Sequence, residues 1–299
     1  MTSFGAAHRI VADLLLARTG QQLGEGRRWR IDSALAGLFR ARGISNLDQL
    51  ACLLAEAGAE PLASEVVEAL LNNETYFFRD RPMFDLLASR VLPDLARRRA
   101  DSRRLRIWSA GCSTGQEAFS LAMLIAADPE RWRGWQIEIV GSDVSHRAVA
   151  AARRARYSQF EIQRGLSVNQ MLTWFREDQR SWTPVEAIRG MVRFEHGNLL
   201  EAGQRRAFDL VLCRNVLLYF DRATRQRAFA RLDEAMAGDG WLLLGAGETV
   251  VGGTGDFEPV EGHQGLCRRR GTGELPEAPA RAPGCQGKYR LNASLAPRR

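Results

Sequence analysis

The sequence predicts an α/β protein in which an all-helical N-terminal segment precedes a larger sheet domain. Before residue 72, apolar residues recur at spacings of three and four, which is typical of amphipathic helices. After residue 82, short apolar strands alternate with helical segments, which indicates a parallel sheet covered by helices on both faces. A chain of 299 residues is long enough to bury a core in each part.

Helices are expected throughout residues 1–72. The first two have apolar faces made of Ile10, Val11, Leu14 and Leu15, and then of Ile31, Leu35, Leu38 and Phe39. Ser45 or Asn46 can cap a third helix, and Pro61 is suited to the first turn of a fourth. These segments predict a small helical bundle that ends near Asn72.

The sheet domain is expected over residues 82–270, after a linker over residues 73–81. Its expected strands are residues 105–109, 136–141, 191–194, 208–213 and 241–244. Its expected helices are residues 84–99, 119–126, 144–156 and 224–237. Residues 157–190 interrupt the alternation and are interpreted as a small β-subdomain insertion. Residues 271–299 are rich in Gly, Pro and Ala without any period, which predicts a disordered tail.

The composition excludes several classes of protein. No apolar run approaches the roughly 18 residues that span a bilayer, and the charged N-terminus does not resemble a secretory signal, so we expect a cytoplasmic protein without membrane insertion. The five cysteines and four histidines are scattered, which argues against a disulfide framework and against a metal site. Residues 268–299 hold eight basic and two acidic residues, so most of the net charge of +7 lies in the tail and no nucleic-acid partner is expected.

Polar turns follow the first two expected strands. The first turn, within residues 109–117, contains Gly111 and ends in Glu117, which could meet the ammonium group of a ligand. The second ends in Asp143, and an aspartate at this position can accept hydrogen bonds from a ribose diol. Taken alone, the first turn could be a plain strand-to-helix connection, and Asp143 in the second could be a helix cap.

Two further segments combine aromatic and polar residues. After the strand at 208–213, Asn215 could hydrogen-bond a cofactor and Tyr219 could present its hydroxyl to a substrate, although a turn asparagine and a core tyrosine would look the same. Residues 72–80 place polar side chains around large aromatic ones at the expected domain junction, which suits a segment that covers a ligand. A plain linker with a surface Arg79–Asp80 pair is the alternative.

Together these segments resemble the CheR-type chemotaxis receptor methyltransferases over about residues 4–267. The resemblance rests on residues 73–79 (NETYFFR), 108–117 (WSAGCSTGQE), 198–200 (NLL) and 213–221 (CRNVLLYFD). Their joint occurrence in this order is specific, whereas no single segment would be. The resemblance implies a Rossmann-like domain that depends on S-adenosylmethionine, joined to an N-terminal helical domain and carrying a small β-subdomain.

The resemblance also implies an activity and a set of site residues. Methyl groups would pass from S-adenosylmethionine to glutamate side chains of a methyl-accepting chemotaxis receptor, which forms glutamyl methyl esters. The implied cofactor-binding residues are Asn73, Thr75, Arg79, Gly111, Glu117, Asp143, Asn198, Leu199, Asn215 and Val216. Arg79 and Tyr219 would be the catalytic pair closest to the transferred methyl group.

This chemistry agrees with the residues at hand. A glutamate carboxylate, with a pKa of about 4.3, is already ionised near neutral pH and needs no strong general base. It needs orientation and partial removal of its water shell instead. Arg79 can orient the carboxylate by charge-assisted hydrogen bonds, and Tyr219 can donate one more.

Arginines crowd the expected second helix, namely Arg27, Arg28, Arg30, Arg40 and Arg42. By resemblance they would face the acidic cytoplasmic coil of the receptor, while a solvated face is the alternative. Gln116 replaces an acid that is usual in the family, and residues 245–248 (GAGE) depart from its usual Gly-His-Ser-Glu. Residues 175–182 lack a Gly-x-Gly, as in members that do not dock on a receptor's C-terminal pentapeptide. Nothing in the sequence requires more than a monomer.

Other functions remain compatible with the same sheet. One is an RNA or small-molecule methyltransferase, which the near-neutral body and the missing Asn/Asp-Pro-Pro-Tyr-type signature argue against. Another is a regulatory module that binds S-adenosylmethionine without transferring its methyl group. The presence of both Arg79 and Tyr219 argues against that alternative.

Overall fold

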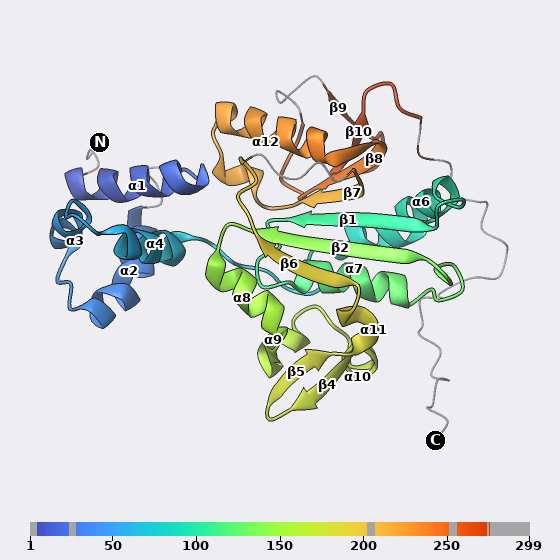
Figure 1. Cartoon of the computed structure of the whole chain (residues 1–299), viewed down its shortest axis with the longest axis horizontal. Coiled ribbons are helices and arrows are strands. Elements are labelled where there is room, and N and C mark those ends of the chain that lie inside the picture. The colour runs from blue at the N-terminus through green and yellow to red at the C-terminus, as the bar shows by residue number, and fades with distance from the viewer. Residues whose placement is uncertain (1–4, 24–27, 202–206, 251–255, 274, 276–299) are drawn as a thin grey trace.

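The N-terminal helices form a bundle around an apolar core of their own. The computed structural model describes residues 5–23, 28–201, 207–250, 256–273 and 275. The bundle contains α1 (Ala6–Thr19), α2 (Arg28–Arg42), α3 (Leu47–Leu54) and α4 (Glu60–Leu70). Its core includes Val11, Ile31, Leu35, Leu50 and Val66, all fully buried. Figure 1 shows the bundle beside the sheet domain, with α4 leading toward it.

Local signals fix the ends of the bundle helices. The side chain of Asn46 accepts a hydrogen bond from the backbone N–H of Gln49 and caps α3, as the sequence predicts. Pro61 lies in the first turn of α4. Helix α1 ends at Gly20, whose φ of 74° is left-handed. A Cβ at Gly20 would lie 2.3 Å from Cδ1 of Leu200, so glycine permits the bundle to approach the sheet domain closely.

A largely parallel sheet forms the centre of the second part. In the described residues its strand order is β6-β2-β1-β7-β8-β10-β9. The strands are β1 (Arg104–Ala110), β2 (Gln136–Asp143), β6 (Val192–His196), β7 (Phe208–Cys213), β8 (Met236–Leu244), β9 (Phe257–Pro259) and β10 (Leu266–Arg269). Strands β6, β2, β1, β7 and β8 are mutually parallel, whereas β10 runs antiparallel to both β8 and β9.

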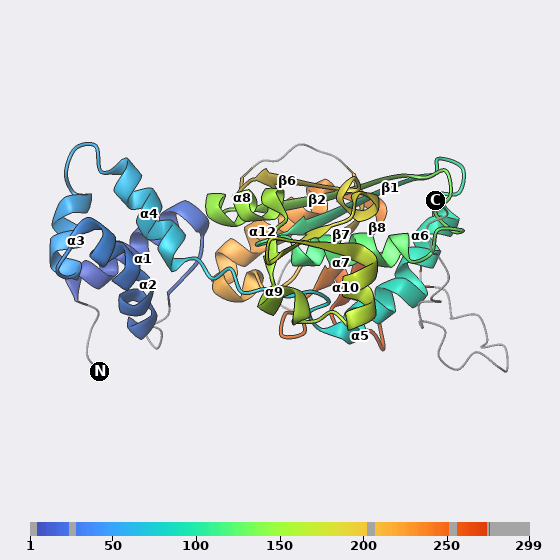
Figure 2. The same cartoon turned by 90° about the horizontal axis from the view of Figure 1, so that it is seen from below.

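Apolar side chains cover both faces of this sheet, as expected for a parallel sheet. In β7, Leu210 and Leu212 contribute to the core that also contains α5 (Arg81–Leu86), α6 (Leu92–Arg98) and α7 (Gln116–Ala126). Val211 and Cys213 point into the opposite core, which contains α12 (Arg222–Ala235). Figure 2 shows the segment after α4 running along the sheet domain toward α5.

Residues 157–190 form a separate small sheet against the main one. Its strand order is β3-β5-β4, with β3 (Tyr157–Ser158), β4 (Phe175–Asp178) and β5 (Ser181–Pro184). Between and after the strands lie α9 (Gln159–Gln163), α10 (Val168–Trp174) and α11 (Glu186–Arg189), and the element before the insertion is α8 (His146–Arg154). The ring of Phe77 packs edge-on against Tyr157 and Phe175, with centroids 5.1 and 5.3 Å away, so the insertion is anchored to the segment after α4.

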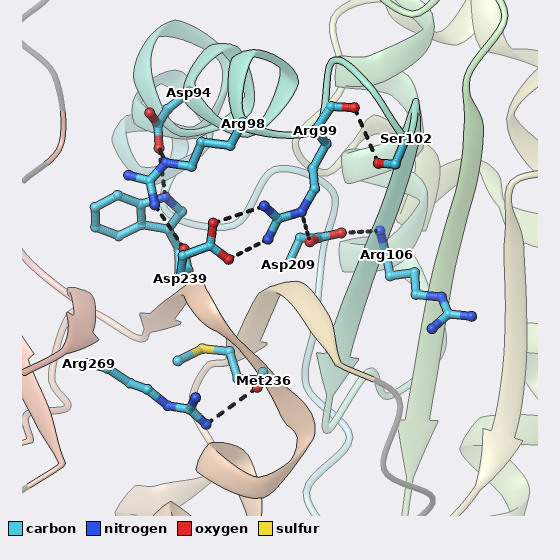
Figure 3. Close-up of polar contacts among 10 residues, drawn as sticks. Asp94, Arg98, Arg99, Ser102, Arg106, Asp209, Met236, Asp239 and Arg269 are labelled. Carbon is cyan, nitrogen blue, oxygen red and sulfur yellow. Dashed lines mark hydrogen bonds and ion pairs between the residues drawn. The ribbon is translucent and has the colours of Figure 1, made fainter. Parts of the chain in front are cut away.

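A cluster of ion pairs holds the amino ends of the strands, as Figure 3 shows. The guanidinium of Arg99 donates to Asp209 from Nε at 2.7 Å and to Asp239 from Nη1 at 2.8 Å. The other carboxylate oxygen of Asp209 accepts from the backbone N–H of Arg106 at 2.8 Å. These contacts tie the residue after α6 to β1, β7 and β8, at the edge opposite the carboxyl ends.

The structure corrects the expected boundaries near the C-terminus. The helix expected over 224–237 ends at Ala235, and β8 begins at Met236, earlier than expected. Within β8 the pairing with β7 is irregular between Phe208 and Leu210, and a Cβ at Gly240 would lie 2.7 Å from Cγ of Met236, so glycine permits this close packing. Strands β9 and β10 were not expected, since each is short. The tail expected to be disordered lies outside the described residues at 274 and from 276 onward.

Candidate functional site

The carboxyl ends of β1, β2 and β7 border a cavity of about 910 Å³, counting its opening to solvent. Such an edge is where ligands bind in open α/β sheets. All of the expected cofactor-binding and catalytic residues line it: Asn73, Thr75, Arg79, Gly111, Glu117, Asp143, Asn198, Leu199, Asn215, Val216 and Tyr219. Of the arginines expected on the second helix, those whose side chains the structure describes, Arg30, Arg40 and Arg42, do not line it.

Gly111 sits where the turn after β1 meets the loop after β7. Its φ of 78° is left-handed, and its N–H donates to the carbonyl of Ser142 at 2.8 Å. A Cβ at this position would lie 2.3 Å from Cγ2 of Val216. Glycine is therefore required both for the backbone conformation and for the space next to Val216.

Glu117 lies in the first turn of α7, and other groups already hold its carboxylate. Oε1 accepts from the hydroxyl of Ser109 at 2.7 Å, and Oε2 accepts from Nη1 of Arg214 at 2.8 Å. A carboxylate has about four acceptor directions, so these two bonds leave capacity for a ligand cation. The contacts fix the orientation of the carboxylate before any ligand arrives.

Asp143 ends β2, and backbone N–H groups hold its carboxylate. Oδ2 accepts from Ser113 at 2.8 Å and Oδ1 from Ser145 at 2.9 Å. Burial raises the pKa of this carboxyl above its usual value, and the two backbone hydrogen bonds oppose that rise. Ser145, not Asp143, is the cap of α8. The aspartate is thus free of a capping role and its remaining acceptor directions belong to the cavity.

The segment after α4 crosses the cavity. The carbonyl of Asn73 accepts from the hydroxyl of Ser113 at 2.7 Å, and the N–H of Phe78 donates to the hydroxyl of Ser120 at 2.9 Å. The guanidinium of Arg79 donates to the carbonyl of Glu74 at 3.0 Å. Asp80 does not pair with Arg79, as a plain linker would suggest, but with Arg214 at 2.7 Å.

The loop after β7 is held by the carboxylate of Glu248. Asn215 has a φ of 61°, a conformation that asparagine tolerates better than most residues. Oε2 of Glu248 accepts a hydrogen bond from the backbone N–H of Asn215 at 2.7 Å and another from the N–H of Gly245 at 2.8 Å. The segment 245–248, which departs from the family pattern, therefore keeps the glutamate that orders this loop.

The bundle closes one side of the cavity. Thr19, Gln21 and Leu71 line it, and the side-chain amide of Asn72 donates to the hydroxyl of Tyr219 at 2.8 Å. The side-chain amide of Asn198 donates to the carbonyl of Arg18 at 3.1 Å. These contacts join the ends of α1 and α4 to the sheet domain.

Several residues that line the cavity were not expected from the sequence. Thr19, Gln21 and Leu71 gave no signal, because their role depends on how the bundle docks on the sheet domain. Arg214 stands within a quoted motif, yet its partners Glu117 and Asp80 are distant in the sequence. The one sequence signal for Arg214 is its position, because it is a charged residue that directly follows a buried strand.

Other chemistries find little support at this cavity. The thiols of Cys112 and Cys213 are buried, and burial raises the pKa of both well above the usual value, so they are poor nucleophiles. No cluster of three potential metal ligands occurs in the described ranges. Across the same ranges, no helix is both long and apolar enough to cross a bilayer.

The donor set fits a nucleoside cofactor that carries a cationic amino-acid group. Glu117 can pair with an ammonium, Asp143 with a ribose diol, and the apolar side chain of Val216 can pack against a planar base. The fold and the cavity thus define an α/β enzyme that binds its cofactor at the carboxyl edge of the sheet.

Comparison with known proteins narrows this class. The family model described as "CheR methyltransferase, SAM binding domain" matches residues 73–266. The chain is 33% identical to Chemotaxis protein methyltransferase Cher2 of Pseudomonas putida, over 83% of this chain and 91% of that protein. It is 32% identical to Chemotaxis protein methyltransferase 1 of Pseudomonas aeruginosa, over 90% of this chain and 99% of that one. The chain belongs to the CheR methyltransferase family, and its cofactor is S-adenosylmethionine.

Proposed function

We propose that this enzyme esterifies glutamate side chains on the cytoplasmic coil of a methyl-accepting chemotaxis receptor. The relatives act in chemotaxis by name, and a carboxylate substrate agrees with the cavity. No histidine occurs among the described residues that line it. A glutamate carboxylate is ionised near neutral pH and does not need one, whereas a hydroxyl or ammonium substrate would first have to lose a proton. This is the observation that carries the proposal.

The proposed roles follow the positions of the side chains around the cavity. Glu117 binds the ammonium of the cofactor and Asp143 its ribose, while Gly111 permits close approach of the backbone. Asn73 and Thr75 cover the cofactor, and the adenine lies among the remaining cofactor-binding residues, Asn198, Leu199, Asn215 and Val216. Bound S-adenosylmethionine supplies an electrophilic methyl group on its sulfonium.

The substrate carboxylate is oriented by Arg79 and Tyr219. Arg79 lies half-buried on the segment that crosses the cavity, and its guanidinium can hold one carboxylate oxygen while the other faces the methyl group. The hydroxyl of Tyr219 is fixed by Asn72, which positions the ring at the opening.

Arginines of α2 are proposed to meet the acidic receptor. Arg27 lies outside the described residues and the side chain of Arg28 is also not described. Arg42 already pairs with Glu65, with Nε donating to Oε2 at 3.2 Å. Arg40 is exposed on the same helix, and Arg30 is half-buried. Replacing Arg40 by Glu should therefore weaken receptor methylation and leave cofactor affinity unchanged.

The product ester is the decisive measurement. Purified enzyme, labelled S-adenosylmethionine and receptor coil should give a product that releases volatile methanol in mild alkali. Alkali-stable label on RNA or on a small molecule would instead establish one of the alternative methyltransferases. Binding of S-adenosylhomocysteine without any transfer would establish a regulatory module. We further propose that the enzyme works in the cytoplasm as a monomer without a nucleic-acid partner.

A further inference from the structure

Arg214 directly follows β7, and its side chain is only 1% exposed. A guanidinium this deeply buried requires anionic or carbonyl partners. Its Nη1 donates to Glu117 at 2.8 Å, and its Nη2 donates both to Oδ2 of Asp80 and to the carbonyl of Arg79, each at 2.7 Å. One side chain therefore contacts the proposed cofactor anchor and the backbone of the proposed substrate anchor.

The backbone on both sides of Arg79 is strained. Phe78 and Asp80 have φ values of 52° and 59°, in the left-handed region that non-glycine residues seldom adopt. Such conformations persist where surrounding contacts over-determine them, and they gather at functional sites. Here the hydroxyl of Ser120 holds the N–H of Phe78, and Arg214 holds Asp80. The direction of the Arg79 side chain is set by this clamped turn.

The charges around Arg214 suit this arrangement. Two carboxylates share one guanidinium, so the group keeps a formal charge of −1 and can still attract a cation. The guanidinium carbon lies 5.5 Å from the centroid of the Phe84 ring, within the range of a cation–π contact. The Nε of Arg214 has no hydrogen-bond partner in the described part of the chain. The guanidinium is therefore oriented so that its two Nη atoms meet their acceptors while its Nε–H stays unpaired.

We propose that Arg214 is a positioning residue that holds Glu117 and the strained turn Phe78–Asp80 as one unit. In this way it sets the separation between the group that binds the cofactor's ammonium and the guanidinium that orients the substrate carboxylate. This inference rests on the proposed function. It predicts that loosening the Asp80 side of the unit changes turnover far more than cofactor affinity.

Asp80→Asn tests the inference directly. Asparagine tolerates the left-handed conformation and has nearly the same size, so the change removes the ion pair and little else. We expect kcat to fall about tenfold, because Arg79 loses its fixed orientation, while the Kd of S-adenosylhomocysteine stays within about threefold. Arg214→Lys should reduce kcat and weaken S-adenosylhomocysteine binding by at least about tenfold, since the three N–H groups of an ammonium radiate from one atom and cannot reach all the acceptors that two separate Nη atoms hold.

A matched control comes from the ion pairs of Figure 3. Asp239→Asn removes one carboxylate partner of Arg99 at the opposite edge of the sheet and should leave kcat and Kd unchanged. Hydrogen exchange of the backbone amides in residues 76–80 of the cofactor-free protein should accelerate in Asp80→Asn and not in Asp239→Asn. This readout requires neither receptor nor turnover.

A double-mutant cycle separates positioning from general destabilisation. Once Arg79→Ala has removed the side chain, adding Asp80→Asn should reduce kcat little further, so the two effects should not add. Additive losses, or unchanged exchange and kcat in Asp80→Asn, would overturn the inference. If the wild-type enzyme formed no alkali-labile ester, the proposed function would fail, whereas the exchange and binding measurements would still decide whether Arg214 fixes the turn.

Discussion

The side-chain amide of Asn72 donates a 2.8 Å hydrogen bond to the hydroxyl of Tyr219 and joins residues 147 positions apart. Asn72 follows the last helix of the bundle, and Tyr219 belongs to the loop after β7. Because the hydroxyl oxygen accepts this bond, its proton is directed away from Asn72. The contact thus orients both the ring and the proton of Tyr219 at the cavity.

Removing either partner should lower turnover, but to different extents. Tyr219→Phe deletes a donor to the substrate carboxylate, and such charge-assisted bonds contribute about 1.5–3 kcal/mol, so kcat should fall roughly tenfold to a hundredfold. Asn72→Ala only releases the ring, with an expected loss of about fivefold. Steady-state kinetics with receptor coil would measure both. A larger loss in Asn72→Ala than in Tyr219→Phe would contradict the assigned roles.

Arg79→Ala should lower kcat by at least about tenfold through lost orientation of the substrate carboxylate. Arg79→Lys keeps the charge but not the fork and should recover only part of that loss. The Kd of S-adenosylhomocysteine, measured by calorimetry, distinguishes substrate orientation from cofactor covering, because only the second role would change it strongly. Wild-type kinetics in Arg79→Ala would remove this residue from the mechanism.

Gly111→Ala should abolish tight cofactor binding, since its Cβ would lie 2.3 Å from Val216 in a left-handed backbone conformation. We expect a weakening of about a hundredfold and a stability loss of about 1–3 kcal/mol. Gly58→Ala is a matched control, with a φ of 85° and no atom within 4 Å of the added Cβ. It should lose stability alone. Equal effects of the two variants on calorimetric affinity would refute the close-approach argument.

Cofactor affinity should decline on acidification earlier than for an ordinary aspartate. Burial raises the pKa of Asp143 above the usual value of about 3.9, and only the carboxylate can accept both ribose hydroxyls. Affinity is therefore full above the raised pKa and is lost as pH falls through it. The effect on folding has the opposite sign, because a raised pKa in the folded state favours folding at low pH and loses this contribution as pH rises.

Calorimetry with S-adenosylhomocysteine from pH 8 down to pH 4 checks the Asp143 prediction. Asp143→Asn should bind more weakly, with a flatter dependence on pH across the same range. If the affinity of the variant and of the wild-type protein falls in the same way as pH is lowered, a group other than Asp143 controls the loss of affinity at low pH.

Asp239→Asn should lower the free energy of unfolding by at most about 1 kcal/mol at pH 7, because the side chain is 44% exposed and its pair is partly screened. Arg99 holds the pKa of Asp239 below its usual value. The carboxylate therefore stabilises the folded state above pH about 3.9 and loses this contribution as pH falls through the lower folded-state pKa. Urea unfolding should show the difference between variant and wild type narrowing toward pH 3; a constant difference would contradict the assignment.

The parts of the site predictable from sequence were those encoded locally. Gly111, Glu117 and Asp143 follow buried strands, and strand ends in a parallel sheet meet at one edge, so local pattern was enough to bring them together. The assignment of adenine and substrate contacts needed the family resemblance, because single asparagines and tyrosines carry no such pattern.

The parts not predictable depend on contacts between distant segments. Arg214 contacts Glu117 and Asp80, which are 97 and 134 residues away in the sequence, and hydrophobic periodicity does not predict such long-range contacts. The end of α12 was also misplaced, because the apolar spacing continues to Ala237 although the chain is already extended at Met236, where β8 begins. Strands β9 and β10 were too short to show alternation.

Thr19, Gln21 and Leu71 give the bundle a share of the cofactor cavity, and Gly20 packs against Leu200 with no room for a side chain. A chimera that carried a relative's first seventy residues would therefore replace part of the wall of the cofactor cavity with the relative's residues. Exchanging this segment to redirect the enzyme toward a new target would alter donor affinity at the same time. Such grafts would need matching changes at Leu200 and along the rim that faces it.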